Sequence, residues 1–205
     1  MALVTSICYQ TQGNNYTLPY FNSASFSGVF NSSGQITAQR ISEQNFAFID
    51  GQNLYMGLKE NGWKADWYSF RKYLSEKCNV TKAIFFLGYI QENEWLYELM
   101  ERAGFTLEFT PTRILPNGQL DGGNVDALLA SYMMDCKNEY SKAVLVADDS
   151  DYCPALESLK RQNKLKLIIS SHPLESTSQW IQQIADTNTL ISIHSLRNEL
   201  EYIKQ

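Results

Sequence analysis

After Arg40, short apolar runs alternate with longer amphipathic stretches along the chain. This alternation is typical of strands and helices arranged around a parallel sheet. The apolar runs predict strands at Phe46–Asp50, Ala83–Tyr89, Thr106–Thr110, Ala143–Ala147, Lys166–Ser170 and Thr189–Ile193. The amphipathic stretches predict helices at Gln52–Glu60, Asp66–Lys77, Glu92–Ala103, Asn124–Cys136, Asp151–Gln162 and Ser176–Asp186, and from Leu196 onward. Because right-handed crossovers place such helices on both faces of a sheet, we predict a three-layer α/β/α, Rossmann-like domain with a mainly parallel sheet.

The N-terminal segment has a different character. From Met1 to Gln39 the chain carries no charged side chain and is rich in Ser, Asn, Gln, Thr and Gly. Such a composition is typical of a disordered, low-complexity tail. The alternation of aromatic and small polar residues over Tyr16–Phe30 leaves a small β-rich extension as the alternative. We therefore predict a tail of residues 1–43 and one domain of residues 44–205.

Composition narrows the class of protein. No apolar run approaches the roughly 20 residues that span a bilayer, so we expect no membrane association. The formal net charge of −5 argues against coating nucleic acid by bulk attraction, although it does not exclude a nuclease whose local site becomes cationic with bound metal. The four cysteines form no CxxC pair and the N-terminus lacks a signal sequence, so we expect reduced thiols and a cytoplasmic location.

Several acids follow the ends of predicted strands. Asp50 ends the first strand, Asp149 and Asp151 follow the fourth, and Asp126 lies in the first turn of a helix. Ligands of such folds bind beyond the carboxyl ends of the strands, so these acids are expected to share one crevice. Carboxylates that lie together resist ionisation unless a cation joins them, and with the amide of Asn53 they offer the oxygen ligands that Mg²⁺ and Mn²⁺ prefer.

Each acid also has a structural interpretation. Asp151 or Ser150 is suited to cap the helix that starts near Pro154, and Asp126 is favoured by the positive end of its helix. Asp50 also fits an ordinary turn at the end of a strand. Asp148 fits either a solvated charge or a group that supports the metal ligands from behind. Only the convergence of several segments favours chemistry over these separate roles.

Metal-assisted phosphodiester hydrolysis is the reaction that best suits such a site. A divalent cation held by carboxylates lowers the pKa of water and stabilises charge on phosphate oxygens. The two histidines, His172 and His194, lie late in the chain without an adjacent partner, which makes histidine acid–base catalysis a weak alternative. A nucleotide-binding or small-molecule phosphohydrolase domain is disfavoured because no glycine-rich phosphate loop follows the first strand.

Three ordered motifs carry a family resemblance. They are Phe-Ile-Asp-Gly-Gln-Asn at 48–53, Gly-Asn-Val-Asp-Ala at 123–127 and Val-Leu-Val-Ala-Asp-Asp-Ser-Asp-Tyr-Cys-Pro at 144–154. Together they resemble the NYN family, in the LabA-like branch of the PIN-domain nucleases, over about Phe46 to Ile193. The resemblance implies a PIN-like fold and an Mg²⁺- or Mn²⁺-dependent endoribonuclease.

The resemblance assigns roles position by position. Asp50 matches the first-strand aspartate and Asp126 the helix aspartate, while Asp149 and Asp151 match the two aspartates of the Asp-Ser-Asp motif. These four are the expected catalytic residues and metal ligands. The residues expected to position substrate or water are Asn53, Ser150 and Tyr152.

Two departures from the family pattern bear on activity. Asp148 stands where glycine usually precedes the Asp-Ser-Asp motif, and Gly122 stands where lysine usually precedes the Gly-Asn-Val-Asp motif. The first adds a charge and a Cβ at a tight turn, and the second removes a cation that could contact phosphate. These changes leave open an alternative function, namely a non-catalytic RNA-binding or assembly module on the same fold.

Basic residues are candidates for contacts with single-stranded RNA, the expected partner. Arg113, Lys160 and Arg161 could contact the phosphate backbone, although a solvated basic helix end is the preferred explanation for Lys160 and Arg161. The glycine-rich loop Ile114–Gly123 fits a substrate flap or a plain connector. Whether the protein forms a homodimer or is recruited by another protein stays open at this level.

Overall fold

The computed structural model describes residues 26–30, 36–40, 43–110, 112–114, 116, 120–122, 124–186 and 188–203. It divides the chain into two units, Met1–Ile41 and Ser42–Gln205. In the first unit, strands β1 (Phe26–Phe30) and β2 (Ile36–Arg40) pair in antiparallel fashion, in keeping with the β-rich alternative. The other residues of the predicted disordered tail, up to Ser42, lie outside the described residues, so for them disorder stays a prediction.

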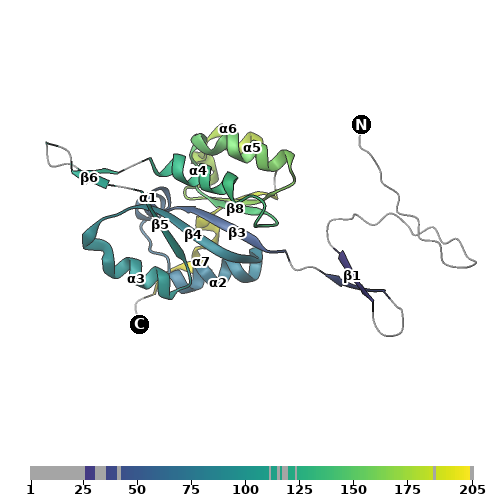
Figure 1. The fold of residues 1–205 in the computed structure, drawn as a ribbon. Coiled ribbons are helices and arrows are strands. Elements are labelled where there is room, and N and C mark those ends of the chain that lie inside the picture. The colour runs from purple at the N-terminus through teal and green to yellow at the C-terminus, as the bar shows by residue number, and fades with distance from the viewer. Residues whose placement is uncertain are drawn as a thin grey trace, which may run out of the picture. The chain divides into compact units, whose positions relative to one another are not determined.

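The second unit contains a six-stranded parallel sheet with the strand order β10-β9-β8-β3-β4-β5 (Figure 1). Its strands are β3 (Asn45–Asp50), β4 (Val80–Gly88), β5 (Thr106–Thr110), β8 (Ala143–Val146), β9 (Leu165–Ser170) and β10 (Leu190–Ser192). Strand β3 pairs with β4 on one side and with β8 on the other. The chain therefore changes direction across the sheet at β3, and a ligand crevice is expected at the carboxyl ends of β3 and β8.

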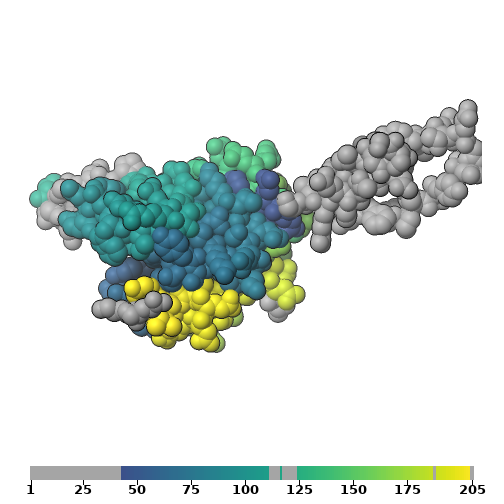
Figure 2. Space-filling model, turned by 90° about the horizontal axis from the view of Figure 1, so that it is seen from below, coloured from purple at the N-terminus to yellow at the C-terminus, as the bar shows by residue number. Residues whose placement is uncertain are grey.

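Helices cover both faces of this sheet. They are α1 (Gly51–Glu60), α2 (Trp67–Cys78), α3 (Glu94–Arg102), α4 (Val125–Asp135), α5 (Cys153–Arg161), α6 (Gln179–Ile184) and α7 (Arg197–Leu200). Residues of α1, α2, α3 and α7 share one core with Ala47 and Ile49, whereas α4, α5 and α6 share a second core with Phe46 and Phe48. Successive side chains of β3 thus point alternately into the two cores, which lie on opposite faces of the sheet. This arrangement confirms the predicted three-layer α/β/α fold. Figure 2 shows the first face, where α2, in blue, lies beside the yellow C-terminal segment.

The predicted elements are found, with shifted ends at several of them. The predicted helix Glu92–Ala103 begins as a 3₁₀ turn at Gln91–Asn93, so that α3 starts at Glu94. Two other helices are shifted in a similar way. The predicted helix Asp151–Gln162 begins as a 3₁₀ turn at Ser150–Tyr152, and α5 starts only at Cys153, because Pro154 is favoured in the first turn of an α-helix. The predicted helix Ser176–Asp186 is reduced to α6, since Leu174–Ser176 form a separate 3₁₀ turn. Both shifts occur at irregular turns that apolar periodicity does not register.

The predicted loop Ile114–Gly123 contains regular structure. Strand β7 (Leu120–Gly122) pairs in antiparallel fashion with β6 (Thr112–Ile114). Strands of three residues are too short to produce a recognisable alternation, which is why the sequence pattern did not reveal them. The remaining positions of this loop, apart from Pro116, lie outside the described residues, and the flap stays a prediction.

No helix in the described part of the chain is both long enough and apolar enough to cross a membrane. The cysteines in this part, Cys78, Cys136 and Cys153, are free thiols.

Candidate active site

Asp50 connects strand β3 directly to helix α1. Its Oδ1 accepts a hydrogen bond of 2.9 Å from the backbone N–H of Asn53, so Asp50 is the N-cap of α1. The side chain is buried, with 5% of the residue exposed. The following Gly51 is closely packed, because a Cβ there would lie 2.1 Å from Cδ2 of Leu87, which would have to move aside, and 3.1 Å from the carbonyl oxygen of Phe86. Asp50 therefore caps a helix and also presents its second oxygen, Oδ2, at the carboxyl edge of the sheet.

Asp126 reaches the same place from helix α4. Asn124 caps this helix by accepting a 2.8 Å hydrogen bond from the N–H of Ala127, which leaves Asp126 in the first turn. The Tyr152 hydroxyl lies 2.6 Å from Oδ1 of Asp126 and 2.8 Å from Oδ2 of Asp50. The two carboxyl groups, 76 positions apart in the sequence, thus meet on one buried phenol at the predicted crevice.

One phenol proton cannot satisfy two carboxylates at once. Tyr152 donates to one of them, and the other contact needs a proton on the carboxyl group, which then donates to the phenol oxygen. Burial, with a smaller contribution from the negative charge of Asp126, raises the pKa of Asp50 from 3.8 to about 6. Burial and the two carboxylates also raise the pKa of Tyr152, so the phenol stays protonated. The cluster therefore retains a proton up to near-neutral pH.

Asp149 and Asp151 lie beyond β8 and are exposed. Asp149 caps the 3₁₀ turn Ser150–Tyr152, and its Oδ1 accepts a 3.0 Å hydrogen bond from the N–H of Asp151. Helix α5 itself has Tyr152 at its N-cap position and no side-chain cap, so neither Asp151 nor Ser150 caps the helix near Pro154. Among the described residues, no group of three or more acidic, histidine or cysteine side chains is spaced to hold a metal ion. The structure thus joins Asp50 with Asp126 and does not bring all four predicted acids into one ligand set.

Asp148 is the buried member of its acidic run, with 8% of the residue exposed. Its Oδ2 accepts hydrogen bonds from the Ser170 hydroxyl at 2.8 Å and the His172 backbone N–H at 3.0 Å, and it lies 2.9 Å from His172 Nδ1. Burial alone raises the pKa of Asp148, but hydrogen bonds from Ser170, Asn53 and His172 outweigh burial and lower it. Asp148 is therefore not a solvated charge, the first of its two predicted roles, while support of the metal ligands stays a prediction.

His172 was not expected near the site. It follows Ser170 and Ser171 at the carboxyl end of β9, beside the end of β8. The feature of the sequence that could have revealed it is the polar run Ser170-Ser171-His172 at the end of a buried strand. Asp148, which stands where the resemblance would place a glycine, is a second such feature. His194, by contrast, accepts a 2.9 Å hydrogen bond from Trp63 within the fold.

The oxygen atoms at the site suit a hard, hydrated cation. Asp50 and Asp126 converge, and Oδ1 of Asn53 is buried without a hydrogen-bond partner among the described residues. A buried acceptor without a partner is costly, and a cation or its water would satisfy it. Mg²⁺ commonly retains several waters and uses only one or two carboxylates, so these residues fit such an ion. Asp149 and Asp151 are exposed acids of the preceding motif that could add to the local negative charge.

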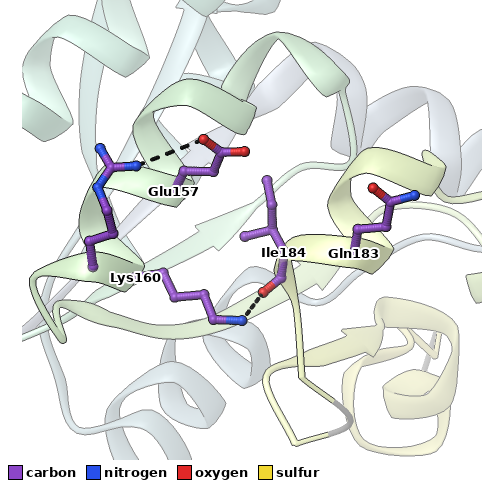
Figure 3. A pocket seen from close by; sticks show the side chains of 5 residues that line it. Glu157, Lys160, Gln183 and Ile184 are labelled. Atoms are coloured by element: carbon purple, nitrogen blue, oxygen red, sulfur yellow. Dashed lines mark hydrogen bonds and ion pairs between the residues drawn. The ribbon is translucent and has the colours of Figure 1, made fainter.

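Lys160 and Arg161, the basic residues of α5 that were predicted to contact RNA, make contacts within the fold. Lys160 donates to the Ile184 carbonyl at 2.6 Å and lies 3.2 Å from Asp186, while Arg161 pairs with Glu157 at 3.9 Å. These contacts surround an open depression of about 450 Å³ between α5 and α6 (Figure 3). Its lining residues are Glu157, Lys160, Arg161, Gln183 and Ile184.

The remaining predicted contacts are placed as follows. Arg113 belongs to β6, and its side chain lies outside the described residues. Ser150 is exposed in the 3₁₀ turn. Tyr152 is fully buried, so in this structure its ring is not open to an RNA base and its hydroxyl serves the two carboxyl groups.

Fold and site together define a class: an α/β/α domain whose acidic site lies at the switch point of a parallel sheet. The model of the NYN domain matches residues 46–193. The chain therefore belongs to the NYN domain family, a family of PIN-like nucleases that hydrolyse nucleic acid. Its assignment to the LabA-like branch stays a prediction.

Solved structures support the fold. A protein of unknown function from Vibrio parahaemolyticus matches with a TM-score of 0.63 and 17% identity, over 80% of this chain and 99% of that chain. A T5 5′-exonuclease with bound divalent zinc ions matches with a TM-score of 0.41 and 16% identity, over 62% of this chain and 55% of that chain. A search of curated proteins found no match. At these identities, the Vibrio protein shows the fold alone and the exonuclease adds no argument.

Proposed function

We propose that this NYN domain is a metal-dependent endoribonuclease that hydrolyses phosphodiester bonds in RNA. The observation that carries the proposal is the meeting of Asp50 and Asp126 on the Tyr152 hydroxyl, at 2.8 and 2.6 Å, where the strand order reverses. Buried carboxyl groups from distant segments have no need to converge for stability, because their mutual repulsion opposes folding. Convergence at a ligand-binding edge favours a role in chemistry.

The proposed roles follow from these contacts. Asp50, Asp126 and the Asn53 amide oxygen would hold Mg²⁺ or Mn²⁺, with Asp149 and Asp151 as further acidic ligands or attracting charges. When bound, such a cation lowers the pKa of water and neutralises charge on phosphate oxygens. Asp50 holds its proton up to a pH of about 6, so above that pH both carboxylates become available as cation ligands.

The proposed substrate is single-stranded RNA. The exposed Ser150 is placed in the turn beside Asp149 and Asp151, where it is suited to position substrate or water. Arg113, Lys160 and Arg161 remain the candidates for the phosphate backbone. We further propose a cytoplasmic location, because the sparse cysteines do not fit a disulfide framework and such reduced thiols are typical of that compartment.

The test is cleavage of a generic single-stranded RNA with Mn²⁺, Mg²⁺ or EDTA. We expect the wild type to cleave RNA only with metal. We expect Asp50→Asn and Asp126→Asn to lose more cleavage activity than the roughly 10–100-fold that removal of an outer-shell partner of a metal ligand costs. Asp149→Asn and Asp151→Asn test whether the exposed acids take part. Asp135→Asn is the matched control, because it removes the same charge from an exposed position at the other end of α4. Full activity in Asp126→Asn would contradict the proposed site.

One observation favours the alternative of a non-catalytic RNA-binding or assembly module. Among the described residues, the four predicted acids do not form one ligand set, and Asp149 and Asp151 are exposed beyond β8. RNA binding that is unaffected by EDTA, without cleavage by the wild type under any metal condition, would support this module and overturn the nuclease proposal.

A further inference from the structure

One face of helix α1 links the proposed site to the end of β9. Asn53, Gly57 and Glu60 are spaced by four and three residues and so lie on the same side of the helix. A Cβ at Gly57 would lie 2.0 Å from the Ser171 carbonyl oxygen, which shows how closely this face packs. At the far end, Glu60 Oε2 lies 3.4 Å from His172 Nε2.

Asp148 completes the link at the near end of this face. Its buried carboxylate accepts hydrogen bonds from the His172 backbone N–H and from the ring Nδ1–H, so His172 holds it with two donors. The side chain of Asn53 also acts on this carboxylate, because it is one of the hydrogen-bonding groups that lower the pKa of Asp148. His172, Asp148 and Asn53 therefore form a polar chain that ends at the proposed cation site, and the Glu60 carboxylate lies beside its far end.

This chain determines which way the Asn53 amide points. A carboxylate only accepts hydrogen bonds, so the atom that Asn53 directs at Asp148 is its Nδ2 donor group. The amide oxygen consequently faces away from Asp148, and it is this Oδ1 that is buried without a partner among the described residues. A flipped amide would place an oxygen against the carboxylate and lose the hydrogen bond.

We propose that Asp148 and His172 are positioning residues that hold the Asn53 amide so that its oxygen is presented to Mg²⁺ or Mn²⁺. The inference rests on the proposed function of the site and adds residues that act on it from behind. Asp148 supplies the acceptor toward which the Asn53 amide donates, and His172 holds that acceptor in place. Support of this kind orients a metal ligand from behind.

The test is a double-mutant cycle on Mn²⁺ affinity, measured with the full chain in the absence of RNA by electron paramagnetic resonance of free Mn²⁺. We expect Asn53→Ala and Asp148→Ala each to weaken Mn²⁺ binding by roughly 10-fold or more. If Asp148 acts through Asn53, the Mn²⁺ affinity of the double variant should be close to that of the single variant with the lower Mn²⁺ affinity. Losses that multiply in the double variant would show independent effects and overturn the inference.

A second cycle avoids removing the buried carboxylate, whose loss could impair folding. His172→Phe keeps a ring of similar size and is expected to weaken Mn²⁺ binding several-fold, with no further loss in the Asn53→Ala background. The matched control is His194→Phe, which removes the partner of Trp63 and is expected to lower thermal stability while leaving Mn²⁺ affinity unchanged. Unchanged Mn²⁺ affinity in folded His172→Phe would overturn the role of His172.

The outcomes also separate this inference from the proposed function. Non-additive cycles without any RNA cleavage would support the positioning role and contradict the nuclease. RNA cleavage together with additive cycles would support the nuclease and contradict the positioning role. Absence of Mn²⁺ binding by the wild type would overturn the metal site and the positioning role together.

Discussion

A single phenol group connects the acids that define the site. The Tyr152 ring is fully buried in the core formed with α4 and α5, and burial obliges its hydroxyl to find hydrogen-bond partners. Asp50 and Asp126 are those partners. Their repulsion is relieved in the metal-free protein by a retained proton, and a cation would relieve it in the same way.

The raised pKa of Asp50 predicts how stability depends on pH without metal. The folded state holds this proton up to about pH 6, whereas the unfolded chain releases it near 3.8, so the folded protein loses stability as the pH rises between these values. This shift in the pKa of Asp50 lowers the free energy of unfolding by roughly 3 kcal/mol at most. Asp50→Asn mimics the protonated acid and should escape this loss.

Urea unfolding in EDTA from pH 4 to 8 measures this effect. The stability of Asp50→Asn relative to the wild type should increase from about pH 4 to pH 6 and stay level above pH 6. A difference that is independent of pH would contradict the assignment of the retained proton to Asp50.

The Tyr152 hydroxyl is expected to compete with the cation for the two carboxylates. Tyr152→Phe removes it and should destabilise the metal-free protein by about 1–3 kcal/mol, since buried acceptors lose their donor. Added Mn²⁺ should then raise the melting temperature more in Tyr152→Phe than in the wild type, because no hydroxyl has to be displaced. Thermal melts with EDTA and with Mn²⁺ provide the comparison, and an equal Mn²⁺ effect in both proteins would refute the competition.

At the scale of the elements, helix α1 is fixed both at its start and at its middle. Asp50 caps its first turn, and Gly57 allows its middle to approach the backbone at Ser171. The distance between α1 and the end of β9 sets where Asn53 and Glu60 lie with respect to Asp148 and His172. The packing of this one helix therefore controls the geometry of the polar chain.

Gly57→Ala tests that packing. A methyl group 2.0 Å from the Ser171 oxygen forces a backbone shift, and overpacking of this kind costs about 1–3 kcal/mol despite the better helix propensity of alanine. Urea unfolding is the measurement. Gln52→Ala, at an exposed position of the same helix, should stay within about 0.5 kcal/mol of the wild type. A stabilised Gly57→Ala would mean that the helix has room to move.

At the scale of the whole chain, the two units differ in what supports them. Both hydrophobic cores consist of residues from the second unit, Ser42–Gln205, and the six-stranded sheet lies entirely within it. Removal of Met1–Ile41 should therefore leave the urea midpoint of the remaining domain unchanged. Comparison of the full chain with the shortened chain by urea unfolding tests this, and a lower midpoint after the deletion would show that the first unit stabilises the domain.

The strands and helices followed from local patterns because they depend on nearby residues. Apolar runs such as Ala143–Val146 are buried on both faces, and Gly104, with φ of 94°, ends the segment after α3 as its sequence predicts. Asp50 and Asp126 were predicted for the same reason, since each lies at a recognisable start of a helix. The contact between Asp148 and His172 was not predicted, because it spans 24 positions and depends on β8 and β9 being neighbours.

The sequence by itself therefore determined the layered α/β/α class, the order of its elements and the oxygen-rich segments after the strands. Those features arise from the periods of strand and helix and from residue chemistry, both of which act locally. Only the tertiary structure decided which acids meet, that Tyr152 joins Asp50 to Asp126, and that Asp149 is exposed while Asp148 is buried. The physical reason is that strand order and side-chain burial are settled by packing between distant segments, on which no local pattern reports.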